Sequence, residues 1–533
     1  MKKFNTTAVC IPSKHYMVDL SERVKGIKKL VDDGKYFTIN RARQYGKTTT
    51  LTALDRLLKE DYYVVSIDFQ DYGDDTFRDT DSFCRDFLND FCSLLEERTD
   101  RTNHGLLEEI EKLSDISDDA EKSLRLFTMF KGIKNIWDSS DKPIVLIIDE
   151  IDSATNNQLF IDFLAALRSH YLKREKNTNY KTFQSVILAG VTDVKHLKSR
   201  IRSEDESKEN SPWNIAADFT IDMSLSETGI KGMLDEYEAD HHTGMNTEAI
   251  AKSIREYTNG YPFLVSRICQ LIDEEVSRAI KPVEAWTSRG IDEAVKLLLS
   301  ENNTLFQSLT KNLNNYPKLK AAIRSILMEG TKLTYNAQQD AIVQMQMYGL
   351  IGNDHNTVRV ANRIFETMLY NLFLSDEELK SNVFSREGEL AKNIFIEDGK
   401  LNMRLIMERF ITTYTEVCGP LKERFKEKDG REQFLLYLKP IINGTGNYYI
   451  EAQTRDQTRT DVIVDYLGQQ YIIELKIWRG ERYHAAGEKQ IGEYLDYWHL
   501  NTGYMLSFNF NQNKEQGVRP VQVGDKLLYE GTV

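Results

Sequence analysis

The chain has few of the residues and patterns that mark disulfide-rich, membrane-spanning or disordered proteins. Only five cysteines occur among 533 residues, and no two are spaced as Cys-x-x-Cys, which argues against a disulfide scaffold and a structural zinc site. Nine prolines are too few for long disordered tracts. No window approaches 18 uninterrupted apolar residues, and no apolar run follows Lys2 and Lys3, so neither a membrane span nor an export signal is expected. These absences predict a reduced, cytoplasmic, globular protein.

An excess of basic charge is also missing. The 69 lysines and arginines are outnumbered by 82 aspartates and glutamates, for a formal net charge of -13. This balance disfavours a protein that coats nucleic acid non-specifically. From position 411 onward the charge is nearly balanced, with 15 basic and 17 acidic residues. Any contact with nucleic acid is therefore better sought near the C-terminal end.

The length suggests three or four domains of about 150 residues each. Residues 1–223 alternate short apolar runs with helical stretches, which predicts an α/β fold whose parallel sheet is covered on both faces. Residues 224–300 indicate a helical lid, and residues 301–380 indicate helices followed by a small hairpin, which suggests a winged helix. Residues 381–533 begin with helices and continue with four β-like runs, NYYIEAQT, DVIVDYL, QYIIELKIW and GYMLSFNF.

A strand, a loop and a helix meet in the sequence KYFTINRARQYGKTTTL. Gly46, Lys47 and Thr48 stand at the junction, where amides at a helix N-terminus bind phosphate. Lys47 would reach the β- and γ-phosphates of ATP, and the Thr48 hydroxyl would bind Mg²⁺. The first glycine of the usual G-x-x-x-x-G-K-[ST] pattern is replaced by Arg41.

A second motif lies 102 residues after Lys47, where the apolar run 146–148 is followed by Asp149 and Glu150. An aspartate at the carboxyl edge of a sheet can hold Mg²⁺ through its water shell, and the next glutamate can polarise an attacking water. Each motif alone also occurs by chance or at the start of a helix. Both together, in this order and on these elements, predict nucleotide binding and make hydrolysis the expected chemistry.

Residues beyond the next apolar strand, SVILAGVT, are candidates for sensing the nucleotide. Thr192 and Asp193 could contact the γ-phosphate, although such residues often only cap the following helix. Arg200 and Arg202 could act on the nucleotide of a neighbouring subunit, or they could be ordinary solvated surface residues.

The segments MKKFNTTAVCIPSKHYMVD, YFTINRARQYGKTTT, VSIDFQ and TNGYPFLV resemble the AAA-ATPase-like family of bacteria, which is related to archaeal and STAND-type ATPases. The resemblance covers about residues 1–375. It makes an arginine at the first loop glycine an expected variation, and it implies ATP and Mg²⁺ as cofactors, a winged helix in QMYGLIGNDHNTVRVANRIF and a nucleotide-dependent homo-oligomer. The residues it places at the nucleotide are Arg41, Arg43, Gly46, Lys47, Thr48, Thr49, Asp149 and Pro262.

The C-terminal β-like runs carry a second group of charged residues. Asp461 opens one run, and Glu474 and Lys476 lie in the next, after a turn at LGQQ. Because side chains alternate along a strand, Glu474 and Lys476 would project from the same face toward Asp461. Two carboxylates beside a lysine suit a Mg²⁺ ion and an activated water, which is the set needed for phosphodiester cleavage. Glu451 or Glu432 could supply another ligand.

This arrangement resembles the PD-(D/E)XK nuclease superfamily over about residues 385–525. Asp461 is followed after twelve residues by Glu474-Leu475-Lys476, and Gln490 and Tyr494 match a Gln-x-x-x-Tyr element of several such nucleases. The resemblance implies a restriction-endonuclease-like α/β domain that binds nucleic acid, with DNA the first choice. It makes Asp461 and Glu474 metal ligands and assigns catalytic roles to these two, Lys476 and Gln490. Thr458 departs from the superfamily's Gly-Arg-x-Asp turn.

The sequence therefore predicts an ATP-binding and ATP-hydrolysing protein coupled to a Mg²⁺-dependent nuclease, in which nucleotide at Lys47 and Asp149 controls the C-terminal site. A role in defence against foreign nucleic acid would follow from family context alone. Two alternatives stay open. The C-terminal fold could be a binding module of a signalling ATPase, since Glu-Leu-Lys in a strand is often only a cross-strand ion pair. The chain could also be a switch that binds ATP without hydrolysing it.

Overall fold

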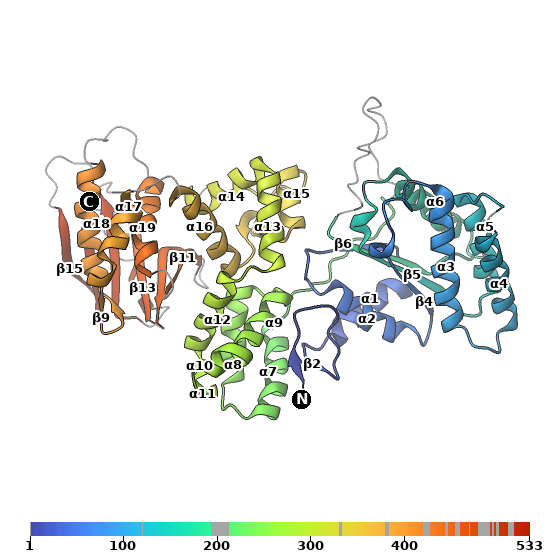
Figure 1. Ribbon diagram of the computed structural model, residues 1–533, viewed down its shortest axis with the longest axis horizontal. Coiled ribbons are helices and arrows are strands. Elements are labelled where there is room, and N and C mark those ends of the chain that lie inside the picture. Colours follow the sequence, from blue (N-terminus) through green and yellow to red (C-terminus); the bar gives the residue numbers. More distant parts are fainter. Residues whose placement is uncertain are drawn as a thin grey trace. The chain divides into compact units, whose positions relative to one another are not determined.

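The computed structural model contains two compact units, whose elements are labelled in Figure 1. The first unit contains Met1–Leu225, Tyr261–Phe263 and Gln346–Gly349. The second unit contains Ser226–Gly260, Leu264–Met345 and Leu350–Val533. The structure describes residues 2–119, 121–192, 194, 213–329, 333–378, 383–418, 427–442, 446–453, 459–467, 469–477, 491–492, 495–496, 500–509 and 516–533.

A four-stranded parallel sheet forms the centre of the first unit. Its order is β3-β6-β5-β4. The strands are β3 (Phe37–Asn40), β4 (Tyr63–Asp68), β5 (Ile144–Asp149) and β6 (Ser185–Gly190). Every residue of β5 and β6 is buried, because helices cover both faces of the sheet. The predicted α/β fold with a parallel sheet is therefore confirmed for this unit.

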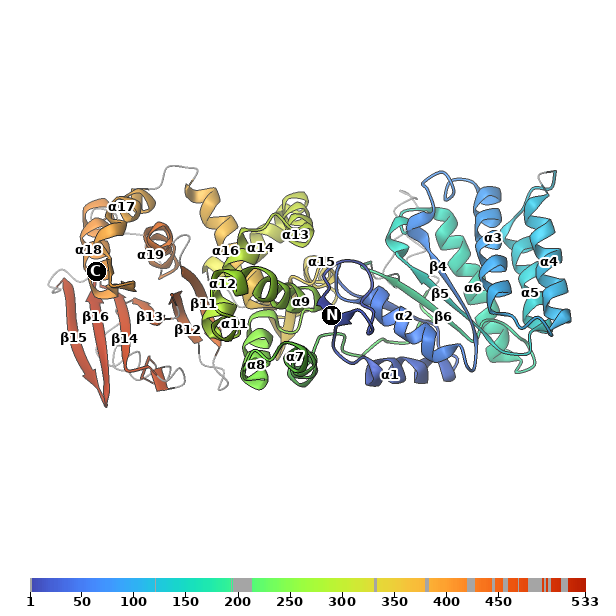
Figure 2. The same cartoon turned by 60° about the horizontal axis from the view of Figure 1, so that its bottom comes forward.

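Six long helices cover the sheet, two on one face and four on the other (Figure 2). Side chains of Val145 and Ile147 pack with α1 (Ser21–Asp32) and α2 (Lys47–Leu58). The alternating residues of the same strand pack on the opposite face, because successive side chains in a strand point to opposite sides. The helices on that face are α3 (Thr80–Arg98), α4 (His104–Asp118), α5 (Leu126–Ser139) and α6 (Gln158–Lys176).

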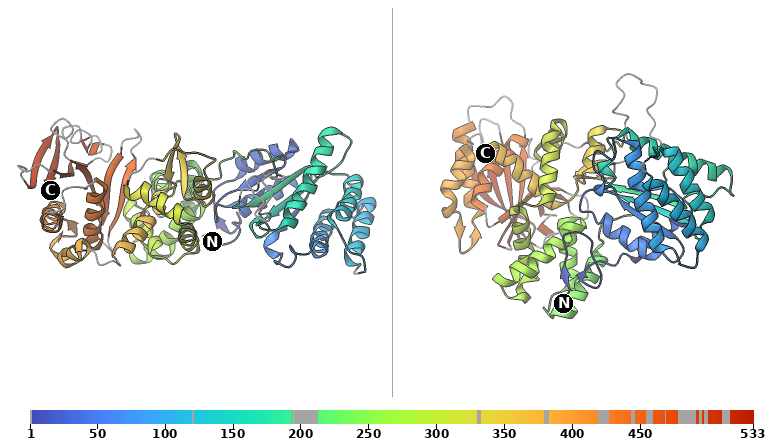
Figure 3. Two further views of the ribbon diagram at one scale, coloured as in Figure 1. Left: turned by 90° about the horizontal axis from the view of Figure 1, so that it is seen from above. Right: turned by 45° about the vertical axis from the view of Figure 1, so that its right-hand side comes forward.

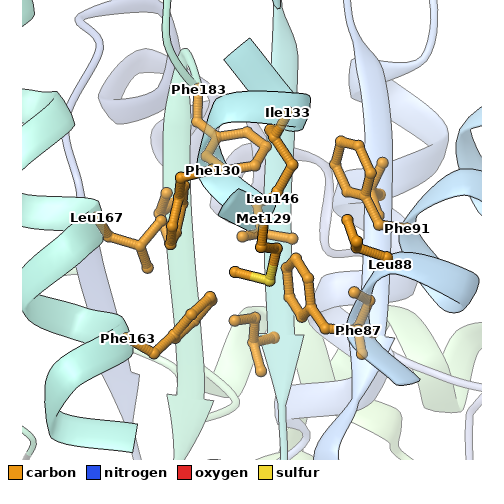
Figure 4. Packing of buried hydrophobic residues seen from close by; sticks show 14 of the residues in the cluster. Phe87, Leu88, Phe91, Met129, Phe130, Ile133, Leu146, Phe163, Leu167 and Phe183 are labelled. Carbon is orange, nitrogen blue, oxygen red and sulfur yellow. The ribbon is translucent and has the colours of Figure 1, made fainter. Parts of the chain in front are cut away.

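Phenylalanine rings fill the space between the sheet and α3, α5 and α6 (Figure 4). The ring of Phe163 lies 5.2 Å from that of Phe87 and 5.8 Å from that of Phe130. Leu146 of β5 and Phe183 are buried in the same cluster. Full burial of one such side chain contributes about 2–3 kcal/mol. This cluster therefore holds β5, with its terminal aspartate, firmly against the helices behind it.

Short segments complete the first unit. The strands β1 (Lys3–Phe4) and β2 (His15–Tyr16) form a small parallel pair. The 3₁₀ turns η1 (Phe69–Asp71) and η2 (Ile151–Ser153) follow β4 and β5. Ala217 forms an isolated parallel bridge to Phe37, which extends the sheet beyond β3.

The second unit begins with helices and a hairpin. Residues 227–300 are mostly helical, and a further group of helices is followed by the antiparallel pair β7 (Ile351–Asp354) and β8 (Thr357–Val360). That the first group acts as a lid stays a prediction. A winged helix in this region stays a prediction. The helices are α7 (Glu227–His241), α8 (Thr247–Thr258), α9 (Pro262–Leu271), the π-helical turn η4 (Ile272–Val276), α10 (Ser277–Ala279), α11 (Pro282–Ala285), α12 (Ser288–Ser300), α13 (Thr304–Asn315), α14 (Pro317–Glu329), α15 (Asp340–Met347) and α16 (Arg363–Glu378). The first two residues of α9 and the last two of α15 belong to the first unit.

A six-stranded mixed sheet forms the C-terminal part of the second unit, in the order β11-β12-β13-β14-β16-β15. The strands β11 to β13 are antiparallel, and β13, β14 and β16 are parallel to one another. The strands are β11 (Gly446–Gln453), β12 (Arg459–Tyr466), β13 (Gln469–Ile477), β14 (Thr502–Phe508), β15 (Gly517–Val523) and β16 (Lys526–Thr532). The four expected β-like runs correspond to β11 to β14, whereas β15 and β16 were not anticipated.

Helices precede this sheet along the chain and pack on one of its faces (Figure 3). These elements are α17 (Val383–Ala391), η5 (Lys392–Ile394), the short pair β9 (Ile396–Glu397) and β10 (Lys400–Leu401), α18 (Met403–Cys418) and α19 (Glu427–Ile442). The helix expected between β13 and β14 lies largely outside the described residues.

Two expectations concern the chain as a whole. Within the described ranges, no helix combines the length and the apolar character that crossing a bilayer requires. Cys10, Cys84, Cys92 and Cys269 are free thiols.

Candidate functional site

The predicted phosphate loop lies at the carboxyl edge of the first sheet, between β3 and α2. Gly46 is the N-cap of α2 and adopts a left-handed conformation with φ of 77°. Glycine takes this conformation at no steric cost, so the first amides of α2 can follow directly after a tight loop. A helix N-terminus that begins at a loop of this kind can bind phosphate.

Lys47 is buried at the start of α2 and bonds to its own loop. Its ammonium donates to the carbonyl oxygens of Arg41 at 3.2 Å and Ala42 at 3.3 Å. Burial holds the pKa of Lys47 below its usual value, although the nearby charges of Glu150 and Asp149 act against this. The ammonium is thus held inside the loop, where an anion could replace the two carbonyl oxygens as its partner.

The two sequence motifs meet at Thr48 and Asp149. The Thr48 hydroxyl donates to Asp149 Oδ2 at 2.9 Å, across 101 residues of sequence. Burial raises the pKa of Asp149, whereas the hydrogen bonds from the Glu150 amide and the Thr48 hydroxyl act in the opposite direction. A hydroxyl and a carboxylate oxygen are the hard donors that Mg²⁺ prefers. These residues therefore fit the ion that the sequence implies.

Glu150 follows Asp149 in a left-handed conformation, with φ of 50°. This conformation is uncommon for a residue with a side chain and occurs often at functional sites. Glu150 is half-buried, and burial raises the pKa of its carboxyl group while the charge of Lys47 lowers it. A carboxylate in this position beside the phosphate loop can accept a proton from a water molecule.

The arginine that replaces the first loop glycine turns its side chain away from the loop. The Arg41 guanidinium donates to the carbonyl oxygens of Asn40 at 2.9 Å and Ile221 at 3.1 Å. It also lies over the ring of Phe219, with 5.3 Å between the guanidinium carbon and the ring centroid. Arg41 therefore ties the loop to the segment beyond the sheet. Arg43 is exposed at the tip of the loop.

A distant segment, Tyr261–Phe263, covers the loop within the first unit. The Tyr261 hydroxyl donates to the carbonyl oxygen of Arg43, and the ring packs edge-on against Tyr45, with 4.7 Å between centroids. A Cβ placed on Gly46 would lie 3.9 Å from Pro262. The structure thus places Pro262 beside the loop glycine.

Thr49 contacts the N-terminal segment of the chain. Its hydroxyl accepts a hydrogen bond from the Cys10 amide at 3.1 Å. The N-terminal strand pair is thereby attached to the first turn of α2, 39 residues along the chain. A role for Thr49 at the nucleotide stays a prediction.

Asp152 is a residue at this edge that the sequence motifs did not single out. Its carboxylate accepts hydrogen bonds from the amides of Val191 at 2.7 Å and Thr192 at 2.8 Å. A Cβ on Gly190 would lie 2.6 Å from Ile151, so the end of β6 can approach η2 this closely only with glycine there. The pattern Asp-Glu-x-Asp in the sequence is the signal that could have identified Asp152. Of the candidate sensors, Asp193, Arg200 and Arg202 lie outside the described residues.

In the second unit, Glu474 and Lys476 lie two residues apart on β13, as expected. The Lys476 ammonium lies 2.6 Å from Glu474 Oε1, and the Glu474 side chain is only 1% exposed. Asp461 lies in β12 directly before Val462, whose Cα pairs with Ile473, the neighbour of Glu474. The structure does not describe the Asp461 side chain, so the proximity of the two carboxylates stays a prediction.

Other candidates of the second site fall into two groups. Gln490, Tyr494 and Thr458 lie outside the described residues. Glu432 forms an ion pair with Arg324 of α14 at 2.8 Å. Among the side chains that the structure describes, no group of three or more His, Cys, Asp or Glu residues is arranged to hold a metal ion.

Comparison with known proteins gives distant relatives. The Walker-type ATPase of Pyrococcus abyssi is 13% identical, with a TM-score of 0.45, over 69% of this chain and 99% of that chain. The ORC1 protein of Aeropyrum pernix, solved in complex with DNA, is 8% identical, with a TM-score of 0.31, over 67% of this chain and 93% of that chain. The RuvB Holliday junction branch migration motor of Thermotoga maritima is 12% identical, with a TM-score of 0.31, over 64% and 92%.

An uncharacterized WD repeat-containing protein of Synechocystis is 23% identical over 363 residues. The match covers 64% of this chain and 28% of that protein, so the chain spans little more than a quarter of its relative. A family model described as an AAA-like domain matches residues 4–373, which is well over half of the chain. This range contains the predicted phosphate loop, the Asp149 strand and the parallel sheet that carries both. The chain belongs to the AAA-like domain family.

Proposed function

We propose that the first unit binds ATP and hydrolyses it. The observation that carries this proposal is the hydrogen bond between Thr48 and Asp149, with Lys47 and Glu150 beside it. Lys47 would exchange its bonds to loop carbonyl oxygens for bonds to the β- and γ-phosphates. Glu150 would accept a proton from the attacking water, since its carboxylate adjoins the same edge. Thr48 and Asp149 would hold Mg²⁺, which supplies charge neutralisation at the transferring phosphoryl group.

Phosphate release from ATP by the full chain tests this proposal. Lys47→Ala should abolish binding of ATP, whereas Glu150→Gln should leave binding intact and lower kcat by at least about 100-fold. Lys59→Ala and Glu60→Gln are matched controls, because both residues are exposed beyond the end of α2. If Glu150→Gln still hydrolyses ATP, a residue other than Glu150 accepts the proton of the attacking water. ATP binding without hydrolysis in the unaltered chain would favour a nucleotide switch.

We further propose that residues 381–533 form a Mg²⁺-dependent nuclease of the PD-(D/E)XK type. Support comes from the strand order around β13 and from the buried Glu474 beside Lys476. Glu474 and Asp461 would be the metal ligands, and Lys476 would orient or help to deprotonate the attacking water. The preceding divisions, a lid at 224–300 and a winged helix at 301–380, belong to the same proposal.

Cleavage of linear, circular and single-stranded DNA and of RNA tests the nuclease. With Mg²⁺ or Mn²⁺, we expect cleavage that Lys476→Ala and Glu474→Gln each reduce by at least about 100-fold. Lys400→Ala, at an exposed residue of the same part of the chain, should cleave normally. Intact substrates under all these conditions would refute the nuclease. Control of cleavage by nucleotide would then be measured by repeating the assay with ATP and with Lys47→Ala.

The ion pair between Glu474 and Lys476 also favours a second candidate, a signalling ATPase whose C-terminal fold only binds a partner. In that case the pair would be structural, because each charge would compensate the other in the sheet. Calorimetric titration with Mn²⁺ separates the two candidates. A nuclease site should bind Mn²⁺ and lose it in Asp461→Ala, whereas a structural pair should give no heat in either chain. A defence role and nucleotide-dependent assembly remain extensions of this proposal.

A further inference from the structure

The helix α18 packs on one face of the C-terminal sheet, whereas the other face carries charged side chains beside Ile491 and Leu495, which pack on Gly503 of β14. A Cβ on Gly531 would lie 2.8 Å from Met407 and 3.2 Å from Ile411, both on α18. Side chains of the sheet that project from the same face as Gly531 therefore point toward the helices. Glu530 precedes Gly531 in β16, so its side chain projects from the opposite face. In Figure 3 the orange helices lie on a single side of the red strands.

Glu474, Met505, Glu530 and Arg519 form one row across four neighbouring strands. The Cα partners are Glu474 with Met505, Met505 with Glu530, and Glu530 with Arg519. Residues directly paired across strands project from the same face of a sheet. Arg519 and Glu530 therefore share the face of Glu474. Because neighbouring strands lie about 4.8 Å apart, the row from Glu474 to Arg519 is about 14 Å long.

Arg519 is an exposed arginine that a buried carboxylate holds in place. Its Nε and Nη2 atoms donate to Glu530 Oε2 at 2.9 and 2.8 Å. The Arg519 side chain is 64% exposed, whereas that of Glu530 is 1% exposed. A buried carboxylate is costly unless it is paired, so Glu530 fixes the guanidinium at the edge of the sheet. The described residues accept only two of the five N–H bonds of the guanidinium, and the others remain available to a ligand.

Ser507 adds a polar group to the adjacent row. It is the Cα partner of Lys476 and is fully buried, and its hydroxyl has no hydrogen-bond partner among the described residues. Buried hydroxyls nearly always have such a partner. We therefore expect the Ser507 hydroxyl to bond to a further polar group, in the space between Lys476 and the edge strand that carries Arg519.

We propose that Arg519, held by Glu530, binds a backbone phosphate of the nucleic acid that the second unit cleaves. This inference rests on the nuclease proposed above. A guanidinium presents paired donors in one plane, which match the oxygens of a phosphate. Its distance of about 14 Å from Glu474 places this phosphate several nucleotides from the scissile bond. Arg519 is thus a positioning residue, which strengthens binding and takes no part in bond cleavage.

Binding of fluorescein-labelled duplex and single-stranded DNA to the full chain tests the proposal by fluorescence anisotropy, in EDTA so that cleavage is excluded. The double variant Arg519→Met, Glu530→Gln removes both charges together and leaves no buried carboxylate unpaired. We expect about fivefold weaker binding and a salt dependence whose slope is smaller by about 1. Arg404→Met is the matched control, because Arg404 pairs with Glu408 and lies over the Tyr529 ring on the helix-covered face. Its binding should equal that of the unaltered chain.

If the double variant and the unaltered chain bind DNA with the same affinity and the same salt dependence, the proposal is overturned. It is also overturned if the unaltered chain binds neither duplex nor single-stranded DNA. Failure of the nuclease is read separately. If the unaltered chain binds DNA through Arg519 in EDTA but leaves it intact with Mg²⁺ or Mn²⁺, the phosphate site stands and the nuclease activity is refuted. In an active chain the double variant should raise KM about fivefold at unchanged kcat. A loss of kcat without a change in binding would contradict the positioning role.

Discussion

Two carboxylates three residues apart serve different partners at the edge of the first sheet. Asp149 accepts a hydrogen bond from Thr48, as a residue that shares a metal ion with it would. Asp152 accepts from the amides of Val191 and Thr192, so it joins the end of β6 to the turn after β5. The position of Thr192, a predicted nucleotide sensor, therefore depends on Asp152.

Asp152→Asn should lower kcat for ATP hydrolysis by about tenfold and destabilise the first unit by about 2 kcal/mol. The amide nitrogen of asparagine is a donor, so it would face one of the two backbone amides and break that hydrogen bond. The displaced end of β6 would then misplace Thr192, and small errors of position slow enzymatic reactions strongly. Phosphate release and thermal unfolding measure the two effects.

Asp79→Asn provides the control for this prediction. Asp79 is the N-cap of α3 and accepts from the Ser82 amide at 2.9 Å. Asparagine caps helices as well as aspartate does, so hydrolysis and stability should both change little. If Asp152→Asn hydrolyses ATP as fast as Asp79→Asn, the joint between β5 and β6 has no part in catalysis.

Single residues of the first site were predictable only where a local rule applies. Gly46 and Lys47 follow from the need for a tight loop before a helix, and Asp149 follows from an apolar strand that ends in an acid. The pairing of Thr48 with Asp149 was implied by these two rules together. The direction of the Arg41 side chain was not predictable, because its partners, Asn40 and Ile221, come together only in the folded unit.

At the scale of elements, the contact between α17 and α19 depends on a glycine. A Cβ on Gly388 would lie 2.1 Å from the carbonyl oxygen of Tyr437 and 3.1 Å from Pro440. Backbone atoms cannot move aside as a flexible side chain can. Gly388→Ala should therefore force the two helices apart and destabilise the C-terminal part by about 3 kcal/mol, as measured by denaturant unfolding.

Gly232→Ala is the matched substitution in a helix without such a contact. Gly232 lies inside α7, and apart from the neighbouring residues and backbone of this helix no atom lies within 4 Å of the position where its Cβ would be. Alanine there should stabilise the protein by about 0.5–1 kcal/mol, because glycine weakens helix interiors. Equal effects of the two substitutions would mean that α17 does not pack closely on α19.

The elements themselves were predictable to different degrees. The buried strands β5 and β6 stand out as uninterrupted apolar runs, and β12 and β13 as apolar runs around a short turn. The strand β15 carries Pro520, which weakens any strand pattern and is tolerated because β15 is an edge strand. The row from Glu474 to Arg519 depends on pairing between strands that lie far apart in the sequence. No local pattern encodes that register.

For the molecule as a whole, the two compact units predict two unfolding transitions in scanning calorimetry. Lys47, Thr48 and Asp149 all belong to the first unit, so a non-hydrolysable ATP analogue with Mg²⁺ should stabilise that unit alone. At a concentration 100 times the Kd, the added stability is about 2.7 kcal/mol. One transition should therefore rise by roughly 5–10 °C, while the other keeps its temperature.

Lys47→Ala identifies which transition belongs to the nucleotide unit. The substitution removes a buried ammonium that bonds to the carbonyl oxygens of Arg41 and Ala42. We therefore expect the ATP analogue to shift neither transition of this variant, while the two units still unfold in separate transitions. Removing Mg²⁺ with EDTA should reduce the shift, since Thr48 and Asp149 would lose the ion they share with the nucleotide. A shift of both transitions by the same amount would contradict binding to one unit, because a ligand raises the stability only of what unfolds together with its site.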